Sequence, residues 1–190
     1  MASKPTTRPA ARRGNTLSAL THCLVESHHQ EIDDELPRLR DMTARLLQRH
    51  GETYHNLAAL LMILLEHFRD AMAHRLIAET DELCPLIDAL EGGRGPSDAV
   101  ERLATLRSRL ELEQLVMAET LDMLRSLTDR YQAPDEACST VRDLYRSLEQ
   151  LDRAVRTQLM IENVVIFPRA VALAMNAPRC AHEPAQALTG

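Results

Sequence analysis

Residues 158–170 of this 190-residue chain read QLMIENVVIFPRA and decide its fold. On a helix, Gln158 and Glu162 lie one turn apart on a face that also carries the apolar residues Leu151 and Val155 and should be buried. A buried polar group costs free energy without a hydrogen-bond partner, and a buried charge needs a counter-charge or a metal. The stretch therefore predicts a helix that packs around a polar centre.

The composition favours an all-α fold. Hydrophobic residues make up 45% of the chain, but aromatic residues make up only 3%, and there is no Trp. The core must therefore consist mainly of Leu, Val, Ile, Ala and Met, a set that suits helices better than β-sandwiches. A chain of 190 residues is long enough for one domain with a sizeable core.

Turn signals divide the chain into four long segments, each of which reads as a helix. The segments cover about residues 16–49, 53–90, 97–131 and 135–175, and the breaks fall at His50-Gly51, at residues 91–96 (EGGRGP) and near Ala133-Pro134. Pro37 lies inside the first segment and should kink it or remove a hydrogen bond. Because short connections force neighbouring helices to be antiparallel, we predict an up-down-up-down four-helix bundle over residues 16–175.

The two ends of the chain lie outside this bundle. Residues 1–15 are basic, so we predict a disordered arm, and residues 176–190 should form a flexible tail. The net charge of -6 argues against general nucleic-acid binding. No apolar run reaches the ~18 residues that span a bilayer, and the N-terminus lacks the apolar segment of a secretory signal. We expect a soluble, cytoplasmic protein without membrane association.

Polar residues interrupt the apolar stripe of each segment at a similar height. They are His29 in the first segment, Glu79 in the second, Gln114 in the third, and Gln158 and Glu162 in the fourth. At a rise of 1.5 Å per residue, they lie within about a turn or two of one another in the bundle. A buried His or Gln often only satisfies core hydrogen bonds, whereas a lone buried carboxylate is expensive. The sequence therefore predicts one polar layer, and hence a site, at this height.

Three motifs give the chain a resemblance to a known family. They are His29 with Glu35-Leu36-Pro37, the segment 134–138 (PDEAC) that leads into Leu144-Tyr145, and residues 162–170 (ENVVIFPRA). From about residue 24 to residue 173, the chain resembles the hemerythrin-like domain of the repair-of-iron-centres proteins. These are bacterial di-iron proteins linked to nitrosative and oxidative stress and to the restoration of iron–sulfur clusters. The resemblance implies four histidine ligands, one per helix, and two bridging glutamates.

The chain departs from that ligand pattern at three of its six positions. His29, Glu79 and Glu162 match the pattern, whereas Arg75, Gln114 and Gln158 stand where the other histidines belong. The amide oxygen of Gln is a weak, neutral ligand for iron, while imidazole and carboxylate hold iron well. The resemblance therefore implies iron as the cofactor, but with a degenerate set of ligands.

His74 offers an imidazole one residue out of register. His74 and Glu79 are five apart and point about 140° away from each other on a regular helix, although a π-bulge would bring them together. Three interpretations stay open: a family-like di-iron centre, a mononuclear or altered iron site that uses His29, His74, Glu79 and Glu162, and a metal-free bundle that has retained the fold. In the metal-free case, Arg75 is the candidate counter-ion for the two carboxylates.

Two functions from different classes follow. The first is a stress-response metalloprotein, similar to the repair family, that binds iron and donates it or handles nitric oxide. The second is a metal-free pseudo-hemerythrin that acts as a binding or regulatory module, with a protein partner or a second copy of the chain. The sequence contains no phosphate loop, dinucleotide motif, CxxC pair or recognisable nucleophile–base pair, so ordinary enzymatic activity is not indicated.

Overall fold

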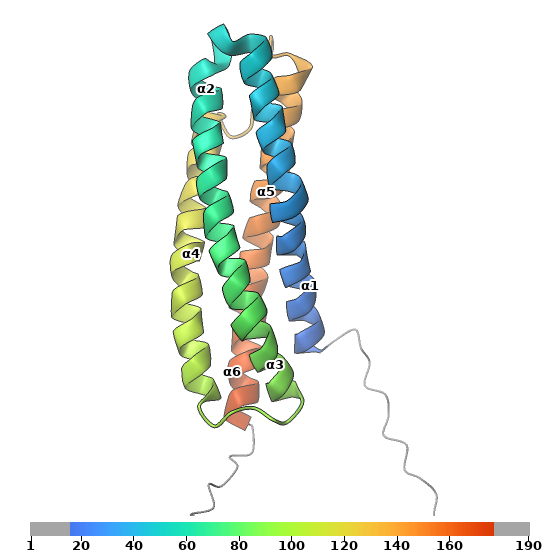
Figure 1. The fold of residues 1–190 in the computed structure, drawn as a ribbon, viewed down its shortest axis with the longest axis vertical. Coiled ribbons are helices and arrows are strands. Elements are labelled where there is room, and N and C mark those ends of the chain that lie inside the picture. The colour runs from blue at the N-terminus through green and yellow to red at the C-terminus, as the bar shows by residue number, and fades with distance from the viewer. Residues whose placement is uncertain (1–15, 177–190) are drawn as a thin grey trace, which may run out of the picture.

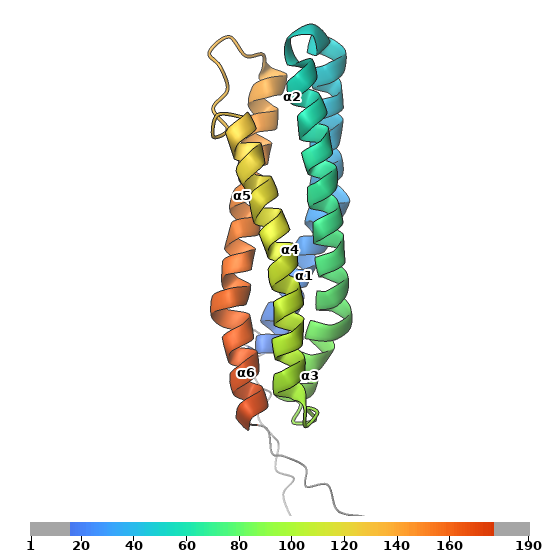
Figure 2. The same ribbon diagram turned by 90° about the vertical axis from the view of Figure 1, so that its left-hand side faces the viewer.

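The structure of the protein is a computed structural model that describes residues 16–176. The predicted N-terminal arm and nearly all of the predicted tail lie outside the described residues. Regular structure within the described range is helical throughout, as the all-α prediction requires. The helices form long rods that lie side by side, from the blue N-terminal rod to the orange and red C-terminal rod (Figure 1 and Figure 2).

Most rods consist of several helical pieces. The first rod comprises α1 (Leu17–Gln30), the π-helical turn η1 (Glu31–Glu35) and the start of α2 (Leu36–Ala78), and the second comprises the rest of α2, the π-turn η2 (Glu79–Leu83) and α3 (Cys84–Glu91). The third rod is α4 (Ala99–Leu127), and the fourth comprises α5 (Ser139–Ile161), the π-turn η3 (Glu162–Ile166) and α6 (Phe167–Asn176).

The chain reverses direction inside α2. The backbone stays helical at the predicted break, His50-Gly51, yet Arg40 Nη1 and Glu66 Oε1 lie only 3.3 Å apart. A straight helix would separate two residues 26 positions apart by ~39 Å at 1.5 Å per residue. The helix must therefore fold back between Arg40 and Glu66, as the ribbon shows at the upper end of the molecule (Figure 1).

Each π-turn precedes a proline. The turns begin at Glu31, Glu79 and Glu162, and Pro37, Pro85 and Pro168 follow six residues after each glutamate. Proline cannot donate a backbone hydrogen bond, and its ring clashes with the carbonyl group four residues earlier in a regular α-helix. A π-turn takes in one extra residue and widens the backbone, which relieves that clash and lets the rod continue. The structure thus has a π-turn where the sequence predicted a kink at Pro37.

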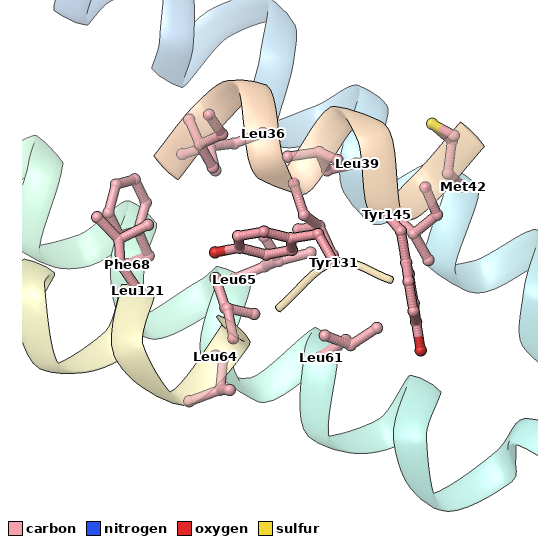
Figure 3. Packing of buried hydrophobic residues seen from close by; sticks show 14 of the residues in the cluster. Leu36, Leu39, Met42, Leu61, Leu64, Leu65, Phe68, Leu121, Tyr131 and Tyr145 are labelled. Atoms are coloured by element: carbon pink, nitrogen blue, oxygen red, sulfur yellow. The ribbon is translucent and has the colours of Figure 1, made fainter. Parts of the chain in front are cut away.

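Two large apolar clusters fill most of the interior, and Val25, Leu76 and Cys84 form a third, small one. The Leu65 cluster takes its buried residues from positions 36–72 and 117–159, and the Ile87 cluster takes its buried residues from positions 17–24, 83–110 and 166–170. Figure 3 shows part of the Leu65 cluster, in which the aromatic ring of Tyr131 lies among leucine side chains such as Leu39 and Leu65. On every rod, a short interval of chain separates the two clusters, and these intervals hold the polar residues of the centre.

One helical stretch, Ser139–Asn176, is long and apolar enough to cross a membrane by length and composition, with a mean hydropathy of 1.4 over an 18-residue window. This finding differs from the expectation that no segment of the chain is apolar enough. A single helix of this kind is weak evidence, because the core helix of a soluble protein passes the same test. This stretch also carries Glu162, whose buried carboxylate pairs with Arg75 of another rod.

Candidate functional site

Four ionisable side chains meet between the two apolar clusters. His28 comes from α1, Arg75 and Glu79 from the second rod, and Glu162 from the fourth rod. Their exposed fractions are 0%, 1%, 0% and 0%, respectively. We call these four residues the charged layer. Because desolvation of each ion costs several kcal/mol, the carboxylates of this layer must be compensated within the protein or by a bound cation.

Arg75 lies between the two carboxylates. Its Nε is 2.7 Å from Glu79 Oε1, its Nη2 forms an ion pair with Glu162 Oε2, and its Nη1 donates a hydrogen bond of 2.9 Å to the carbonyl oxygen of Leu110. Burial lowers the pKa of the Arg75 guanidinium, and the neighbouring Glu79 carboxylate opposes that shift. The guanidinium stays charged because its ordinary pKa lies far above neutral pH. One positive charge therefore serves carboxylates on two different rods.

His28 completes the layer on the side of α1. Its Nδ1 lies 2.7 Å from Glu79 Oε2, and its Nε2 lies 3.9 Å from Glu162 Oε1. The first distance is that of a strong hydrogen bond, whereas the second is too long for one. Glu79 therefore holds His28 with one carboxylate oxygen and Arg75 with the other.

Two half-buried pairs of side chains border the charged layer. Gln158 Nε2 donates a hydrogen bond of 2.9 Å to Glu31 Oε1, and Asn163 Nδ2 donates one of 2.9 Å to Gln114 Oε1. Burial raises the pKa of Glu31, while His28 and the hydrogen bond from Gln158 act in the opposite direction. Each of the two Gln side chains thus has one hydrogen-bond partner in the protein, and the Oε1 atom of Gln158 has none among the described residues.

The structure corrects the prediction that His29 belongs to the site. His29 is exposed, and the preceding residue, His28, is the buried one. The prediction placed His29 on the apolar stripe of one regular helix that includes Leu36, but η1 lies between these two residues and contributes one extra residue to its turn. That insertion moves the inward position from residue 29 to residue 28, in line with the buried Leu24 of α1.

The structure also corrects the placement of His74. His74 is exposed, whereas its neighbour Arg75 points into the bundle. A π-turn does occur nearby, but η2 begins at Glu79 and so lies after the pair instead of between its two members. The backbone N–H of Glu79 still bonds to the carbonyl of Arg75, as in a regular α-helix. Because residues four apart share a face, Glu79 meets Arg75 and not His74.

Glu31 was missed by reasoning from the sequence. It is the first residue of η1, just as Glu79 and Glu162 are the first residues of their π-turns. The signal that could have revealed it is the spacing of a glutamate six residues before a proline, which occurs three times, in EIDDELP, ETDELCP and ENVVIFP. This spacing groups Glu31 with Glu79 and Glu162, and it could have indicated that Glu31 lies beside the centre.

Comparison with known proteins points to one kind of protein. No protein-family model matches the chain. The iron–sulfur cluster repair protein YtfE of Edwardsiella ictaluri is 32% identical over 158 residues, which cover 82% of this chain and 66% of that protein. The chain is similar to iron–sulfur cluster repair proteins. The repair protein ScdA of Staphylococcus epidermidis is 24% identical over 153 residues, with coverages of 80% and 66%, so this chain spans about two thirds of the length of both relatives. YtfE of Musicola paradisiaca is 26% identical over 164 residues, with coverages of 84% and 68%.

The residues of the centre do not fit a pair of iron ions. His28, Glu79 and Glu162 each offer one ligand atom within 4.8 Å of the others, but His28 is the only imidazole in that group. The guanidinium of Arg75 pairs with both carboxylates, so an ion that bridged Glu79 and Glu162 would lie against a fixed positive charge. The described residues therefore supply too few imidazoles for a dinuclear centre. The guanidinium of Arg75 also adds a positive charge where such a centre would bind its metal ions.

Proposed function

We propose that this chain is a hemerythrin-like protein of the iron–sulfur cluster repair type, with an up-down-up-down bundle, in which Arg75 takes the place of a metal ion. It acts in the cytoplasm in the maintenance of iron centres under stress, without dinuclear iron chemistry. The similarity to the named repair proteins supports the general role. The altered centre is supported by the contacts of Arg75.

A single observation carries the proposal about the centre. The buried guanidinium of Arg75 contacts Glu79, Glu162 and the carbonyl oxygen of Leu110, so its donors are directed at acceptors on three rods. Guanidinium suits such a position because it is planar, permanently charged and able to donate several hydrogen bonds at once. Two iron ions between these carboxylates would be repelled by that guanidinium and would compete with it for the same carboxylate oxygens.

Iron content of the purified protein tests the proposal. We expect well under two irons per chain in protein from iron-supplemented cells, and no near-ultraviolet absorption band of an oxo-bridged di-iron centre. Two irons per chain together with that band would contradict the proposal.

A pair of variants sharpens the test. In the double variant Gln114→His, Gln158→His, Arg75 remains between the carboxylates, so iron uptake should stay below two per chain. Adding Arg75→His removes the fixed cation and places an imidazole four residues before Glu79, where it shares a face with that carboxylate. Iron uptake should rise in the triple variant, measured under identical loading, and equal uptake by the two variants would show that Arg75 does not exclude metal.

A second candidate function is a binding or regulatory module without a metal, acting on a protein partner or as a homodimer. The observation that favours it is that Gln114 and Gln158, which stand where the resemblance implies histidines, are engaged with Asn163 and Glu31. Recovery of an iron–sulfur enzyme after nitric oxide exposure separates the two functions. Faster recovery in cells that contain the protein supports the repair role, and equal recovery with and without it supports the module.

A further inference from the structure

A groove rich in arginine lies between the start of α2 and the start of α5. Arg38, Arg45 and Arg49 line it from α2, and Asp143 and Arg146 line it from α5. Its volume is about 640 Å³, within the range of small-molecule sites. Four arginines against one aspartate give the groove a positive charge, although the whole chain carries a net charge of -6. The groove therefore concentrates positive charge at one place on an acidic protein.

Two of these arginines have no ion-pair partner among the described residues. Arg38 pairs with Glu35 and Arg146 pairs with Asp143, as most arginines of the described chain pair with a carboxylate. Arg45 and Arg49 are exposed and form no such pair within residues 16–176. Their guanidinium groups are thus available to an anion that enters the groove.

The stability of α2 does not account for this arrangement. Arg45 and Arg49 are four residues apart on one helix, so their side chains share a face. Like charges at this spacing destabilise a helix, and no carboxylate of the groove compensates these two. A pair of repelling, unpaired arginines in a groove is explained by a bound anion that neutralises both.

The spacing of the two arginines indicates the size of that anion. Arg45 and Arg49 lie one turn apart, or about 6 Å along the helix axis. A ligand with two neighbouring anionic groups can contact both guanidinium groups at once. The planar fork of N–H donors on each guanidinium matches the oxygens of a phosphate group, with two parallel hydrogen bonds.

The remaining lining residues also suit phosphate oxygens. Thr140 offers a hydroxyl group in the first turn of α5, which contains no acidic residue, and Gln150 offers an amide N–H. No aromatic ring is among the described residues that line the groove, so the groove lacks a surface on which a nucleobase could stack. Together with the negative net charge, this favours a phosphate-bearing small molecule over a nucleic acid.

We propose that this groove binds a soluble small molecule through its diphosphate group, with Arg45 and Arg49 as the main contacts and Arg38 and Arg146 as supporting charges. The groove is separate from the charged layer, because Arg45 lies roughly 25 Å beyond His28 along the first rod. The inference therefore goes beyond the proposed function and does not depend on the position of Arg75.

Isothermal titration calorimetry of the full-length protein with inorganic pyrophosphate, in metal-free buffer of low ionic strength, tests the proposal. We expect one pyrophosphate per chain, with an affinity that falls as NaCl is added. Orthophosphate should bind at least about tenfold more weakly, because it spans one guanidinium instead of two. Absence of pyrophosphate binding, or equal affinity for the two anions, would overturn the proposal.

Vesicles of phosphatidylglycerol test whether the phosphate belongs to a lipid. They present single phosphate groups on a membrane surface, and the protein should not sediment with them. Sedimentation with the vesicles together with an absence of pyrophosphate binding would overturn the proposal in favour of a membrane surface.

Matched double variants assign the site to its residues. Arg45→Ala with Arg49→Ala should weaken pyrophosphate binding by at least about tenfold. Arg94→Ala with Arg102→Ala removes the same charge beside the loop between α3 and α4, at the lower end of the molecule in Figure 1, and should bind as the parent does. Equal losses in the two double variants would overturn the proposal.

Thermal unfolding separates a loss of binding from a loss of folding. Without ligand, Arg45→Ala with Arg49→Ala should unfold at or above the temperature of the parent, because two like charges are removed from one helix face. Pyrophosphate should raise the unfolding temperature of the parent but not that of this variant, since only a ligand that binds the folded state stabilises it. An equal rise in both proteins would place the anion elsewhere and overturn the proposal.

Discussion

The charged layer and the Leu65 cluster are both buried, but they respond to change by different physics. In the Leu65 cluster, attraction is non-directional and shared among many side chains. Truncation of one side chain therefore lowers the free energy of unfolding in proportion to the volume removed. In the charged layer, each member depends on particular partners, because Arg75 and Glu79 each contact two other members of the layer or its border. Removal of one partner leaves the others charged, buried and unpaired. Equally buried residues therefore need not tolerate substitution equally well.

The largest effect is expected for Arg75→Ala. Removal of one partner from a buried ion pair typically costs about 3–5 kcal/mol, and here two carboxylates lose their counter-charge together. Chemical denaturation followed by circular dichroism measures the loss. Arg153→Ala is the matched control, since the Arg153 side chain is 77% exposed and pairs with Glu149 at the surface. Similar losses for the two variants would show that Arg75 is not the counter-ion.

A slightly smaller loss is expected for Leu65→Ala in the apolar cluster. Leu65 is 2% exposed, and truncation of a buried leucine costs about 2–5 kcal/mol according to how far the cavity can close. Unlike Arg75→Ala, this variant leaves the ion pairs of the charged layer intact, so added divalent metal should raise its stability no more than that of the parent. Thermal unfolding with and without Co²⁺ measures the difference. A selective rescue of Leu65→Ala by metal would remove the proposed distinction between the two regions.

The smallest effect concerns the reactivity of Cys84, which reports on the charged layer without destabilising it. Burial raises the pKa of the Cys84 thiol to about 11, from an ordinary value of 9.0, with smaller contributions from Asp88 and Glu79. The difference of about two units leaves roughly a hundredfold less thiolate near neutral pH, and the thiolate is the reactive form. The pKa of Cys138 is lowered because backbone N–H groups at the start of α5, chiefly that of Val141, favour its thiolate.

Peptide mapping after brief alkylation with iodoacetamide at pH 8 measures this contrast. Cys138 should be modified much faster than Cys84 in the parent protein. Arg75→Ala should increase the labelling of Cys84, because the layer next to it loosens, whereas Arg153→Ala should not. Equal labelling of Cys84 in the parent and in Arg75→Ala would mean that the layer does not control access to this part of the interior.

Most of the residues that form the centre could be predicted from the sequence. Which of two neighbouring residues on a helix faces the centre could not always be predicted. The spacing of Arg75 and Glu79 is local, because residues four apart on one helix must share a face. The height at which Glu79, Gln114 and Glu162 interrupt their apolar stripes is also readable, because the rise per residue is constant. The choice between His28 and His29 was not readable in this way, since it depends on whether the turn between the histidine and Leu36 holds one residue more than a regular turn.

The sequence by itself determined that the chain is helical and that it carries carboxylates at positions which helical periodicity places on buried faces. Those properties follow from composition and from repeats of three and four residues, which act within a single helix. Only the tertiary structure decided that Arg75 reaches both Glu79 and Glu162, that His28 Nε2 faces Glu162, and that Gln158 is engaged with Glu31. These contacts join side chains from different rods. They depend on the three π-turns, because an extra residue within a rod turns the face of the helical piece on one side of it by about 100° relative to the piece on the other side.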